Sequence, residues 1–218
     1  MANIIGTKHP SYRIRRSGMK GGKFNGAYYY ALEIEKNIIP NIRTDRAWVL
    51  LNCRGFAFNH SIVFIHNNLH PENYEWLKFF GFQDLILVCG IPETCEKVKH
   101  LGRTIYLPLS IDVQEVTQYK TEKTKEAAFV GRAVKRRGLK FPETVDYIEG
   151  LERAELLQEM AKYKTVYAVG RCAIEAKALG CDVKAYDPRF PDPSIWKVID
   201  NKDAAAILQK QLDEIDRG

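Results

Sequence analysis

The stretch YAVGRCAIEAKALGCDVKAY, residues 167–186, predicts the fold. Its first apolar residues are typical of a buried strand that ends at Gly170, and helix-forming residues follow at once. Gly180 is the kind of residue that ends a helix, and the apolar residues around Val183 predict a second strand. A strand, a sharp turn, a helix and another strand form the unit from which parallel sheets are built.

The same alternation of apolar runs and helix-like segments extends along the rest of the chain. The expected strands are residues 4–5, 48–52, 62–66, 85–88, 104–107, 127–130, 145–148, 165–169 and 183–186. The expected helices are residues 26–38, 72–80, 93–101, 154–163, 171–179 and 204–215.

A polar interval divides this alternation into two halves. Residues 112–126 are rich in Thr, Gln and Lys and lack apolar periodicity, which is typical of a linker between domains. We therefore expect an α/β protein with two Rossmann-like lobes and a cleft between them, residues 1–110 forming the first lobe and residues 111–218 the second. A single doubly wound sheet is the alternative.

The composition is that of a globular protein, with 45% hydrophobic and 28% charged residues among 218. No apolar run approaches the roughly 18 residues that span a bilayer, and the first ten residues lack the apolar core of a signal peptide. The five cysteines are odd in number and form no C-x-x-C pair. This favours reduced thiols over disulfides or a zinc site, so we expect a cytoplasmic protein.

Positive charge is concentrated near the start of the chain. Residues 1–105 carry 14 Lys and Arg against 8 Asp and Glu, whereas residues 106–218 carry 19 of each. The basic N-terminal segment, residues 1–23, contains six cations and no acid: Lys8, Arg13, Arg15, Arg16, Lys20 and Lys23. Such a segment attracts a phosphate, an acidic glycan, a nucleic acid or a membrane surface. A solvated basic loop is the alternative.

The turn at Gly170 is the first candidate ligand site. Glycine allows a sharp turn and a close approach of the ligand. The backbone N–H groups of a helix that starts at Gly170, Arg171 and Cys172 favour an anion such as a diphosphate, and the Arg171 guanidinium suits phosphate. Glu175 lies one helical turn further on and is a candidate acceptor for two ribose hydroxyls. The alternative is an ordinary strand–turn–helix with a surface glutamate.

A second candidate is FVGRAVKRRGL, residues 129–139, in which an expected strand ends at Gly131. Four cations follow: Arg132, Lys135, Arg136 and Arg137. Open α/β sheets bind ligands at the carboxyl ends of their strands, and clustered cations there suit a diphosphate leaving group. A basic loop on the surface is the alternative.

Together these stretches resemble the C-terminal lobe of GT-B glycosyltransferases, the group that includes the bacterial group-one transferases. YLPLSID, residues 106–112, is similar to the family's interdomain segment, and FVGR, residues 129–132, to its strand-Gly-Arg motif. Residues 148–161 resemble the segment that ends in a short Glu-Leu helix. IEAKALGCDV, residues 174–183, is similar to the family's Leu-Glu-Ala-x-Ala-x-Gly-x-Pro-Val motif. The four segments occur in the family's order.

The resemblance implies a GT-B fold and a retaining, metal-independent transfer of a sugar from a nucleotide diphosphate-sugar, such as a UDP-sugar. The family's Arg and the Lys five residues later contact the donor diphosphate, and Arg132 and Arg137 stand at these positions. The family's ribose-binding Glu corresponds to Glu175. Tyr167 stands where the family often carries a second Glu, so the contacts to the donor sugar differ here.

The first lobe contributes three further candidates. Gly21 and Gly22 resemble the family's double-glycine loop, which faces the donor phosphates. His66 ends an expected strand, where a neutral imidazole is a candidate catalytic base. Capping of the strand by His66 is the alternative. His66 and His70 lack a third ligand and the sequence contains no Asp-x-Asp motif, so we expect no metal.

We therefore expect a glycosyltransferase that uses no cofactor besides its nucleotide-sugar donor. The acceptor is expected to bind the first lobe and to be anionic: a glycan, a lipid-linked molecule or a nucleic acid, with peripheral membrane contact as an open alternative. A non-catalytic nucleotide- or nucleotide-sugar-binding protein is the second hypothesis. Nucleic-acid binding through the basic N-terminal segment is the third, although Tyr12 and Phe24 are the only aromatic residues close to those cations.

Overall fold

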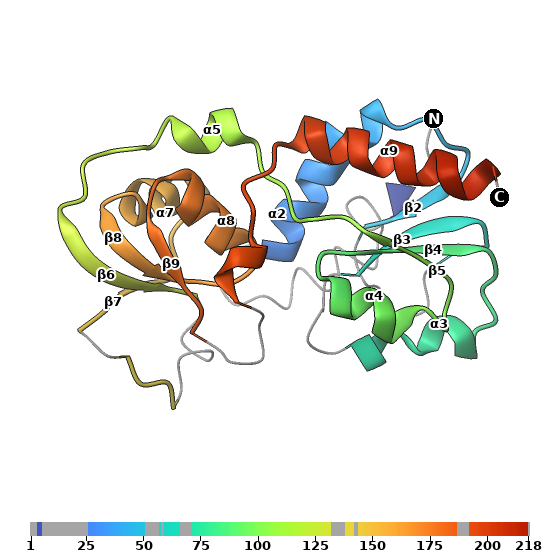
Figure 1. The fold of residues 1–218 in the computed structure, drawn as a ribbon, viewed down its shortest axis with the longest axis horizontal. Helices are drawn as coiled ribbons and strands as arrows, with labels where there is room; N and C mark the ends of the chain where they lie inside the picture. The colour runs from blue at the N-terminus through green and yellow to red at the C-terminus, as the bar shows by residue number, and fades with distance from the viewer. Residues whose placement is uncertain are drawn as a thin grey trace. The chain divides into compact units, whose positions relative to one another are not determined.

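The computed structural model describes residues 4–5, 26–50, 57, 59–65, 71–131, 138–141, 144–186 and 192–217. The chain forms two compact units. Unit 1 comprises Met1–Pro108 and Asn201–Gly218, and unit 2 comprises Leu109–Asp200. Each unit has its own parallel sheet with helices (Figure 1), so the α/β class is confirmed and the alternative of a single sheet is wrong.

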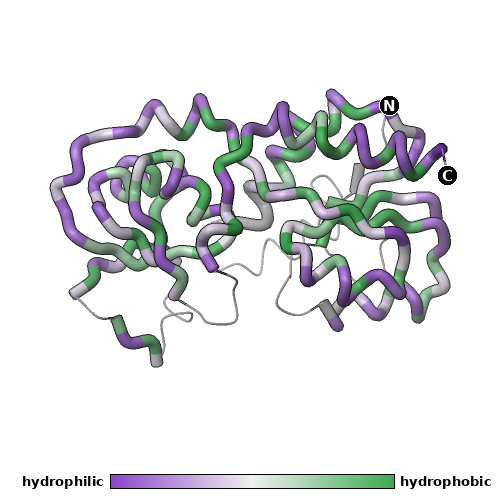
Figure 2. The backbone as a smooth tube through the Cα atoms, in the orientation of Figure 1, coloured by the Kyte–Doolittle hydropathy of each residue, from purple (hydrophilic) through white to green (hydrophobic). Residues whose placement is uncertain are grey.

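The sheet of unit 1 follows chain order, β1-β2-β3-β4-β5, and all its strand pairs are parallel. Its strands are β1 (Ile4–Ile5), β2 (Ala47–Val49), β3 (Ser61–Ile65), β4 (Leu85–Cys89) and β5 (Arg103–Tyr106). Every residue of β3 and β4 is buried. Burial on both faces explains why these strands are unbroken apolar runs in the sequence, as the hydropathy colouring in Figure 2 shows.

Helical segments cover both faces of this sheet (Figure 1). One face carries η4 (Pro71–Tyr74), α3 (Trp76–Phe79) and α4 (Pro92–Val98), whose side chains join a core cluster with β2, β3 and β4. The other carries α2 (Gly26–Glu33) with its continuations η2 (Ile34–Ile38) and η3 (Ile39–Asn41). There the Tyr30 ring meets Phe64 edge to face at 6.5 Å, and Phe64 stacks on Trp48 at 6.2 Å.

The last helix, α9 (Asn201–Arg217), also belongs to unit 1. Leu208 and Leu212 are buried along its apolar stripe, and the helix packs against η2 and η3. The Gln209 side chain accepts from the Arg43 N–H at 2.6 Å and donates to the Arg43 carbonyl at 3.3 Å. The sequence analysis assigned residues 201–218 to the second lobe, whereas the structure groups this helix with unit 1.

The sheet of unit 2 has the order β7-β6-β8-β9, and all its pairs are parallel. Its strands are β6 (Lys125–Val130), β7 (Asp146–Ile148), β8 (Tyr163–Tyr167) and β9 (Asp182–Lys184). The helical segments are α5 (Val113–Thr117), α7 (Arg153–Met160), α8 (Arg171–Ala178) and η5 (Pro193–Ile195). Both α7 and α8 contact β8 and each other, so they cover the same face of the sheet.

Aromatic side chains form the second core layer of unit 2. The Phe129 ring lies 4.8 Å from Tyr186 and 5.9 Å from Phe141, between ring centroids. Phe141 in turn lies 4.8 Å from Tyr167. The Phe129–Tyr186 and Phe141–Tyr167 pairs are edge to face, and such pairs stabilise a core beyond the area that they bury. The cluster lies directly beneath the carboxyl ends of β6 and β8.

The segment 112–126 is part of unit 2 rather than a featureless linker, so this expectation is wrong. Asp112 is the N-cap of α5, where its carboxylate accepts from the Glu115 N–H at 2.8 Å. The Lys123 ammonium donates to the Ala161 carbonyl at 2.7 Å and to the Leu179 carbonyl at 2.9 Å. These carbonyls end α7 and α8, so one lysine caps two helices.

The predicted end of α8 is confirmed in detail. Gly180 has a φ of +81°, and its N–H donates to the Lys177 carbonyl at 2.9 Å. The Cys181 N–H donates to the Ala176 carbonyl at 2.9 Å, which completes a Schellman motif.

No helix within the described ranges combines the length and the apolar character that crossing a membrane requires.

Candidate functional site

The strand order of unit 2 creates a topological switch point between β6 and β8. The chain leaves β6 toward β7, its neighbour on one side, and leaves β8 toward β9, on the other side. Because β6 and β8 are adjacent, their two outgoing connections diverge at the carboxyl ends of these strands, which makes this place a topological switch point. Ligands of open α/β sheets bind at such switch points.

Gly131 and Gly170, the glycines of the two candidate sites, stand at this switch point. Register pairs Phe129 of β6 with Tyr167 of β8, so Gly131 and Gly170 follow adjacent strands at the same edge of the sheet. A Cβ atom at Gly131 would lie 3.0 Å from the Phe129 ring, so a larger residue would require this ring to move by a few tenths of an ångström. The sequence analysis predicted both turns, and the structure brings them together.

Gly170 has a backbone conformation that only glycine adopts readily. Its φ is 62° and its ψ is −134°, outside the left-handed helical region that Asn or Asp can occupy. This conformation turns the chain from β8 directly into α8, whose first residue is Arg171. The carbonyl of Gly170 then accepts from Ala173 at 3.1 Å and from Ile174 at 3.2 Å, which anchors the first turn of the helix.

Glu175 binds two arginines within unit 2. Its Oε1 accepts from Arg171 Nε at 2.8 Å and from Arg153 Nη1 at 2.5 Å. The Glu175 side chain is 2% exposed, and the Arg171 and Arg153 side chains are 9% and 17% exposed. The alternative of a surface glutamate is therefore wrong. We call these three residues the Arg–Glu–Arg cluster, and its formal charge is +1.

Arg153 was not a candidate from the sequence. It is the first residue of α7, where Glu152 and Glu155 form a reciprocal capping box that fixes the helix start. Its Nε also donates to Glu115 of α5 at 3.3 Å. The cluster therefore connects three helices of unit 2. The sequence shows the Glu-x-x-Glu pattern of a helix start, with Arg153 inside it. Nothing in the sequence indicates that Arg153 pairs with Glu175.

The cluster can perform two tasks. The fixed carboxylate of Glu175 holds the Arg171 side chain at the start of α8, where the helix dipole also favours negative charge. The Arg171 guanidinium and the helix start together favour an anion such as a diphosphate, while Glu115, which pairs with Arg153, balances the remaining charge of the cluster. Because Oε1 of Glu175 already accepts from two guanidinium groups, a ribose hydroxyl would share this carboxylate with both of them.

Among the remaining candidate residues, the structure describes Cys172 alone. Cys172 is the second residue of α8, is partly buried and is not part of a disulfide. Gly21, Gly22, His66, Arg132 and Arg137 lie outside the described residues, so their roles stay predictions.

The opposite edge of the unit 2 sheet carries a different group of charges. At the start of β6, Lys125 donates to Glu159 at 2.7 Å and to the Tyr163 hydroxyl at 3.1 Å, and this hydroxyl donates to Asp146 at 2.8 Å. Hydrogen bonds from Lys125 and Lys162 lower the pKa of Glu159 to about 2. Burial raises the pKa of Tyr163 to about 12. These groups satisfy one another, which is the arrangement of a structural network.

Within the described part of the chain, no three His, Cys, Asp or Glu side chains are placed to hold a metal ion. No protein-family model, curated protein or solved structure matches this chain. The features of the molecule that bear on function are therefore the switch point of the unit 2 sheet, the Gly170 turn and the Arg–Glu–Arg cluster.

Proposed function

We propose that the chain is a glycosyltransferase of the GT-B type, in which unit 2 binds the nucleotide diphosphate part of a sugar donor. The observation that carries the proposal is the position of two glycines that each precede an arginine in the sequence. Gly131 and Gly170 follow the two adjacent strands that flank the switch point of unit 2.

The chemistry of the leaving group supports this choice of ligand. In the transfer, an acceptor hydroxyl oxygen bonds to the anomeric carbon of the sugar, the bond from that carbon to the diphosphate oxygen breaks, and the hydroxyl proton passes to a base. The nucleoside diphosphate leaves with additional negative charge. Arg132, Arg171 and the start of α8 are suited to stabilise this charge without a metal ion.

The proposal assigns the remaining roles as follows. Glu175 keeps Arg171 in place and contacts the ribose, and Arg137 adds a second cation at the diphosphate. Gly21 and Gly22 keep the phosphate-binding role that the resemblance implies, and unit 1 binds an anionic acceptor through the basic N-terminal segment. His66 accepts the proton from the acceptor.

A second candidate function is nucleotide-sugar binding without transfer. Tyr167 stands where the family often carries a Glu, and its ring is 5% exposed and packs against Phe141 at 4.8 Å. A buried tyrosine cannot replace a carboxylate beside the sugar. This observation favours a site that retains the nucleotide contacts and lacks part of the sugar contacts.

Calorimetry with UDP, GDP and ADP, followed by the corresponding sugar donors, tests the proposal. One nucleoside diphosphate should bind, and Arg171→Ala should weaken it by about 1.5–3 kcal/mol, the range for a lost charge-assisted hydrogen bond. Hydrolysis of the bound donor separates the transferase from the binding protein, because only a transferase should release the sugar slowly to water.

Lys164→Ala is the matched control. Lys164 lies on β8, the strand that precedes α8, near its amino end, and forms an exposed pair with Glu126 at 2.5 Å. Exposed pairs of this kind contribute little to stability, so this variant should bind the nucleotide like the wild type. Equal weakening by both substitutions, or binding of no nucleoside diphosphate, contradicts the proposed site.

A further inference from the structure

Two cysteines of unit 1, Cys89 and Cys95, lie together between the sheet and helix α4. Cys89 is the last residue of β4, and Cys95 is the fourth residue of α4. Both belong to the core cluster that the sheet shares with α3 and α4, and they are 0% and 8% exposed. Neither cysteine is part of a disulfide in the structure, so the pair is a dithiol.

The periodicity of the strand and of the helix places the two thiols opposite each other. Along β4, Leu87 and Cys89 belong to the cluster and Val88 between them does not, because successive side chains of a strand alternate between its faces. On α4, Cys95 and Val98 belong to the same cluster and are about one turn apart. Cys89 therefore faces the helix and Cys95 faces the strand, and their side chains form a hydrogen bond.

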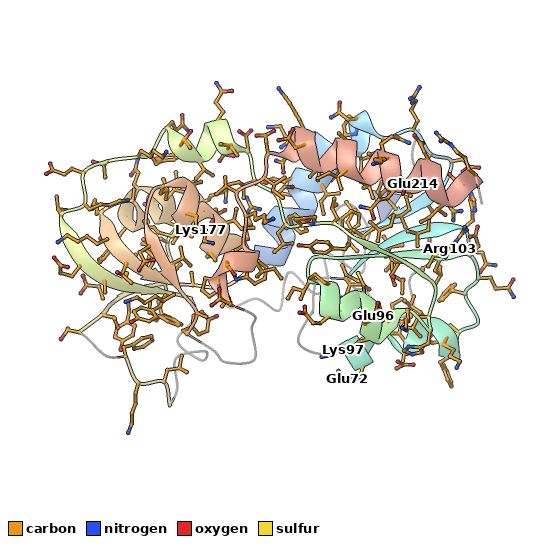
Figure 3. The ribbon with its side chains drawn as sticks, in the orientation of Figure 1. Glu72, Glu96, Lys97, Arg103, Lys177 and Glu214 are labelled. Atoms are coloured by element: carbon orange, nitrogen blue, oxygen red, sulfur yellow. The ribbon has the colours of Figure 1, made fainter. Side chains whose placement is uncertain are left out.

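This hydrogen bond makes the two thiols unequal. It lowers the pKa of Cys95, and together with burial it raises the pKa of Cys89. Burial and the charge of Glu96 on α4 (Figure 3) oppose the shift at Cys95, but Glu96 is itself paired with Lys99 at 2.7 Å. Of the two sulfurs, Cys95 is thus the one that becomes a thiolate first, and a thiolate is the reactive form of cysteine.

Tyr106 is the other titratable group beside the pair. It lies on β5, directly opposite Cys89 in the register of the sheet. Burial, followed by the proximity of Cys95, raises the pKa of Tyr106, so this side chain stays a neutral phenol. A neutral neighbour adds no negative charge that would oppose a thiolate at Cys95.

We propose that Cys89 and Cys95 are a redox-active dithiol, which hydrogen peroxide converts reversibly to a disulfide between β4 and α4. The sequence contains no C-x-x-C pair, and the two cysteines are separated by residues 90–94, so the pairing follows only from the way the strand and the helix pack. This inference is independent of the proposed donor site, because it uses other residues in the other unit.

The oxidation takes two steps. The Cys95 thiolate attacks one oxygen of the peroxide, the O–O bond breaks, and Cys95 becomes a sulfenic acid, while the leaving hydroxide takes up a proton and forms water. The Cys89 sulfur then attacks the sulfenic sulfur, an S–S bond forms, and the sulfenic oxygen leaves as water with the Cys89 proton. The two sulfurs together lose the two electrons that the peroxide gains.

Peptide mapping of the whole folded chain measures this disulfide directly. The protein is treated with hydrogen peroxide, the excess is removed with catalase, and the remaining thiols are alkylated with iodoacetamide in denaturant. Trypsin then releases residues 79–97 as one peptide, which contains Cys89 and Cys95 and no other cysteine. This peptide should be two hydrogens lighter and carry no alkyl group. Reduction with dithiothreitol before alkylation should restore two alkyl groups.

Single substitutions test the order of the two steps. Cys89→Ser should abolish the disulfide and leave Cys95 as a sulfenic acid, which dimedone traps on the same peptide. Cys95→Ser should abolish both the disulfide and the dimedone adduct. Cys181→Ser in unit 2 is the matched control, because Cys181 is also buried, and this variant should form the disulfide like the wild type. Circular dichroism checks that each variant is folded, and the wild-type map needs no variant.

Three results overturn the proposal. The first is full alkylation of the peptide 79–97 after peroxide treatment, which would make the pair inert thiols of the core. The second is a disulfide that joins this peptide to a different one, because the partner of the reactive thiol would then lie elsewhere. The third is a dimedone adduct on Cys89 in Cys95→Ser with none on Cys95 in Cys89→Ser, which would reverse the roles of the two sulfurs.

Discussion

His60 and Asp84 are hydrogen-bonded partners that both have positive φ angles, 58° and 51°. They immediately precede β3 and β4, two adjacent strands, and His60 Nδ1 lies 2.5 Å from Asp84 Oδ2. Asp84 also accepts from Arg103 at 2.7 Å, at the start of β5 (Figure 3), and from the buried Arg46 at 3.1 Å. Side chains from the starts of four neighbouring strands therefore meet at one carboxylate.

This arrangement makes the stability of unit 1 depend on pH. Hydrogen bonds to Asp84 and Asp45 raise the pKa of His60 above its usual value of 6.5. A raised pKa means that protonated His60 stabilises the folded state, so its contribution is complete below pH 6.5 and is lost as the pH rises through the folded-state pKa. Because His60 is 45% exposed, the loss should be about 1 kcal/mol or less.

At acidic pH, the dependence of the stability of unit 1 on pH has the opposite sign. The hydrogen bond from His60, with those from Arg103 and Arg46, lowers the pKa of Asp84 below its usual value of 3.8. Its contribution is present above that pH and is lost as the pH falls through the folded-state pKa. Urea denaturation between pH 3 and pH 9 should show a maximum between these limits. His60→Asn, which tolerates a positive φ, should flatten the alkaline side, and an unchanged profile would remove His60 as its cause.

Lys123→Met should destabilise unit 2 by about 1–2 kcal/mol. The substitution keeps the length of the side chain and removes the charge that caps the Ala161 and Leu179 carbonyls at the ends of α7 and α8. Lys120→Met is the control, because Lys120 is exposed in the same segment. Thermal unfolding followed by circular dichroism measures both variants, and equal melting temperatures would contradict the capping role.

The two glycines that flank α8 should respond differently to asparagine. Gly180→Asn should cost well under 1 kcal/mol, because asparagine is common at the left-handed position after a helix. Gly170→Asn should cost about 1–3 kcal/mol, because a φ of 62° with a ψ of −134° is nearly restricted to glycine. Denaturant titrations of the two variants give the comparison. Similar costs would mean that the Gly170 turn relaxes without strain.

Transfer activity should survive EDTA. Among the described residues no carboxylate or histidine cluster is placed for a divalent ion, and the proposed site neutralises the diphosphate with arginines and a helix start. Turnover of the donor is measured with and without the chelator. A loss that Mg²⁺ or Mn²⁺ restores would contradict metal independence.

The sequence predicts the backbone elements of this protein better than it predicts the partners of its side chains. The apolar runs located the strands to within a few residues, because buried parallel strands leave continuous hydrophobic stretches. The Gly180 helix end was predicted because its chemistry is local. The strand order β7-β6-β8-β9 was not, since it depends on which strands pair at long range.

Side-chain partners were the least predictable feature. Glu175 was identified one turn after Gly170, but its burial and its bond to Arg153, 22 residues earlier, depend on how α7 packs on α8. The polar segment 112–126 indicated a linker because it lacks apolar periodicity. Its cap at Asp112 and its Lys123 contacts are polar interactions, which a hydrophobic pattern does not report.

The two arginines of the Arg–Glu–Arg cluster should differ in their contribution to nucleotide binding. Arg153 and Arg171 donate to the same oxygen of Glu175, yet only Arg171 stands at the start of α8 after the switch-point turn. Arg171→Met should weaken the binding of the nucleoside diphosphate by about 1.5–3 kcal/mol. Arg153→Met should leave that affinity within about twofold of the wild type, because Glu175 still pairs with Arg171.

The substitutions in the cluster should rank differently in their effect on the free energy of unfolding. Glu175→Ala leaves the buried Arg171 guanidinium without its carboxylate and Arg153 with Glu115 alone, so it should destabilise unit 2 by about 3 kcal/mol or more. Each arginine variant should cost less, because the remaining arginine still neutralises Glu175. Denaturation gives the stabilities, and calorimetry on folded protein gives the affinities. If Arg153→Met and Arg171→Met weaken nucleotide binding equally, the cluster acts only as a structural clamp and the diphosphate is bound elsewhere.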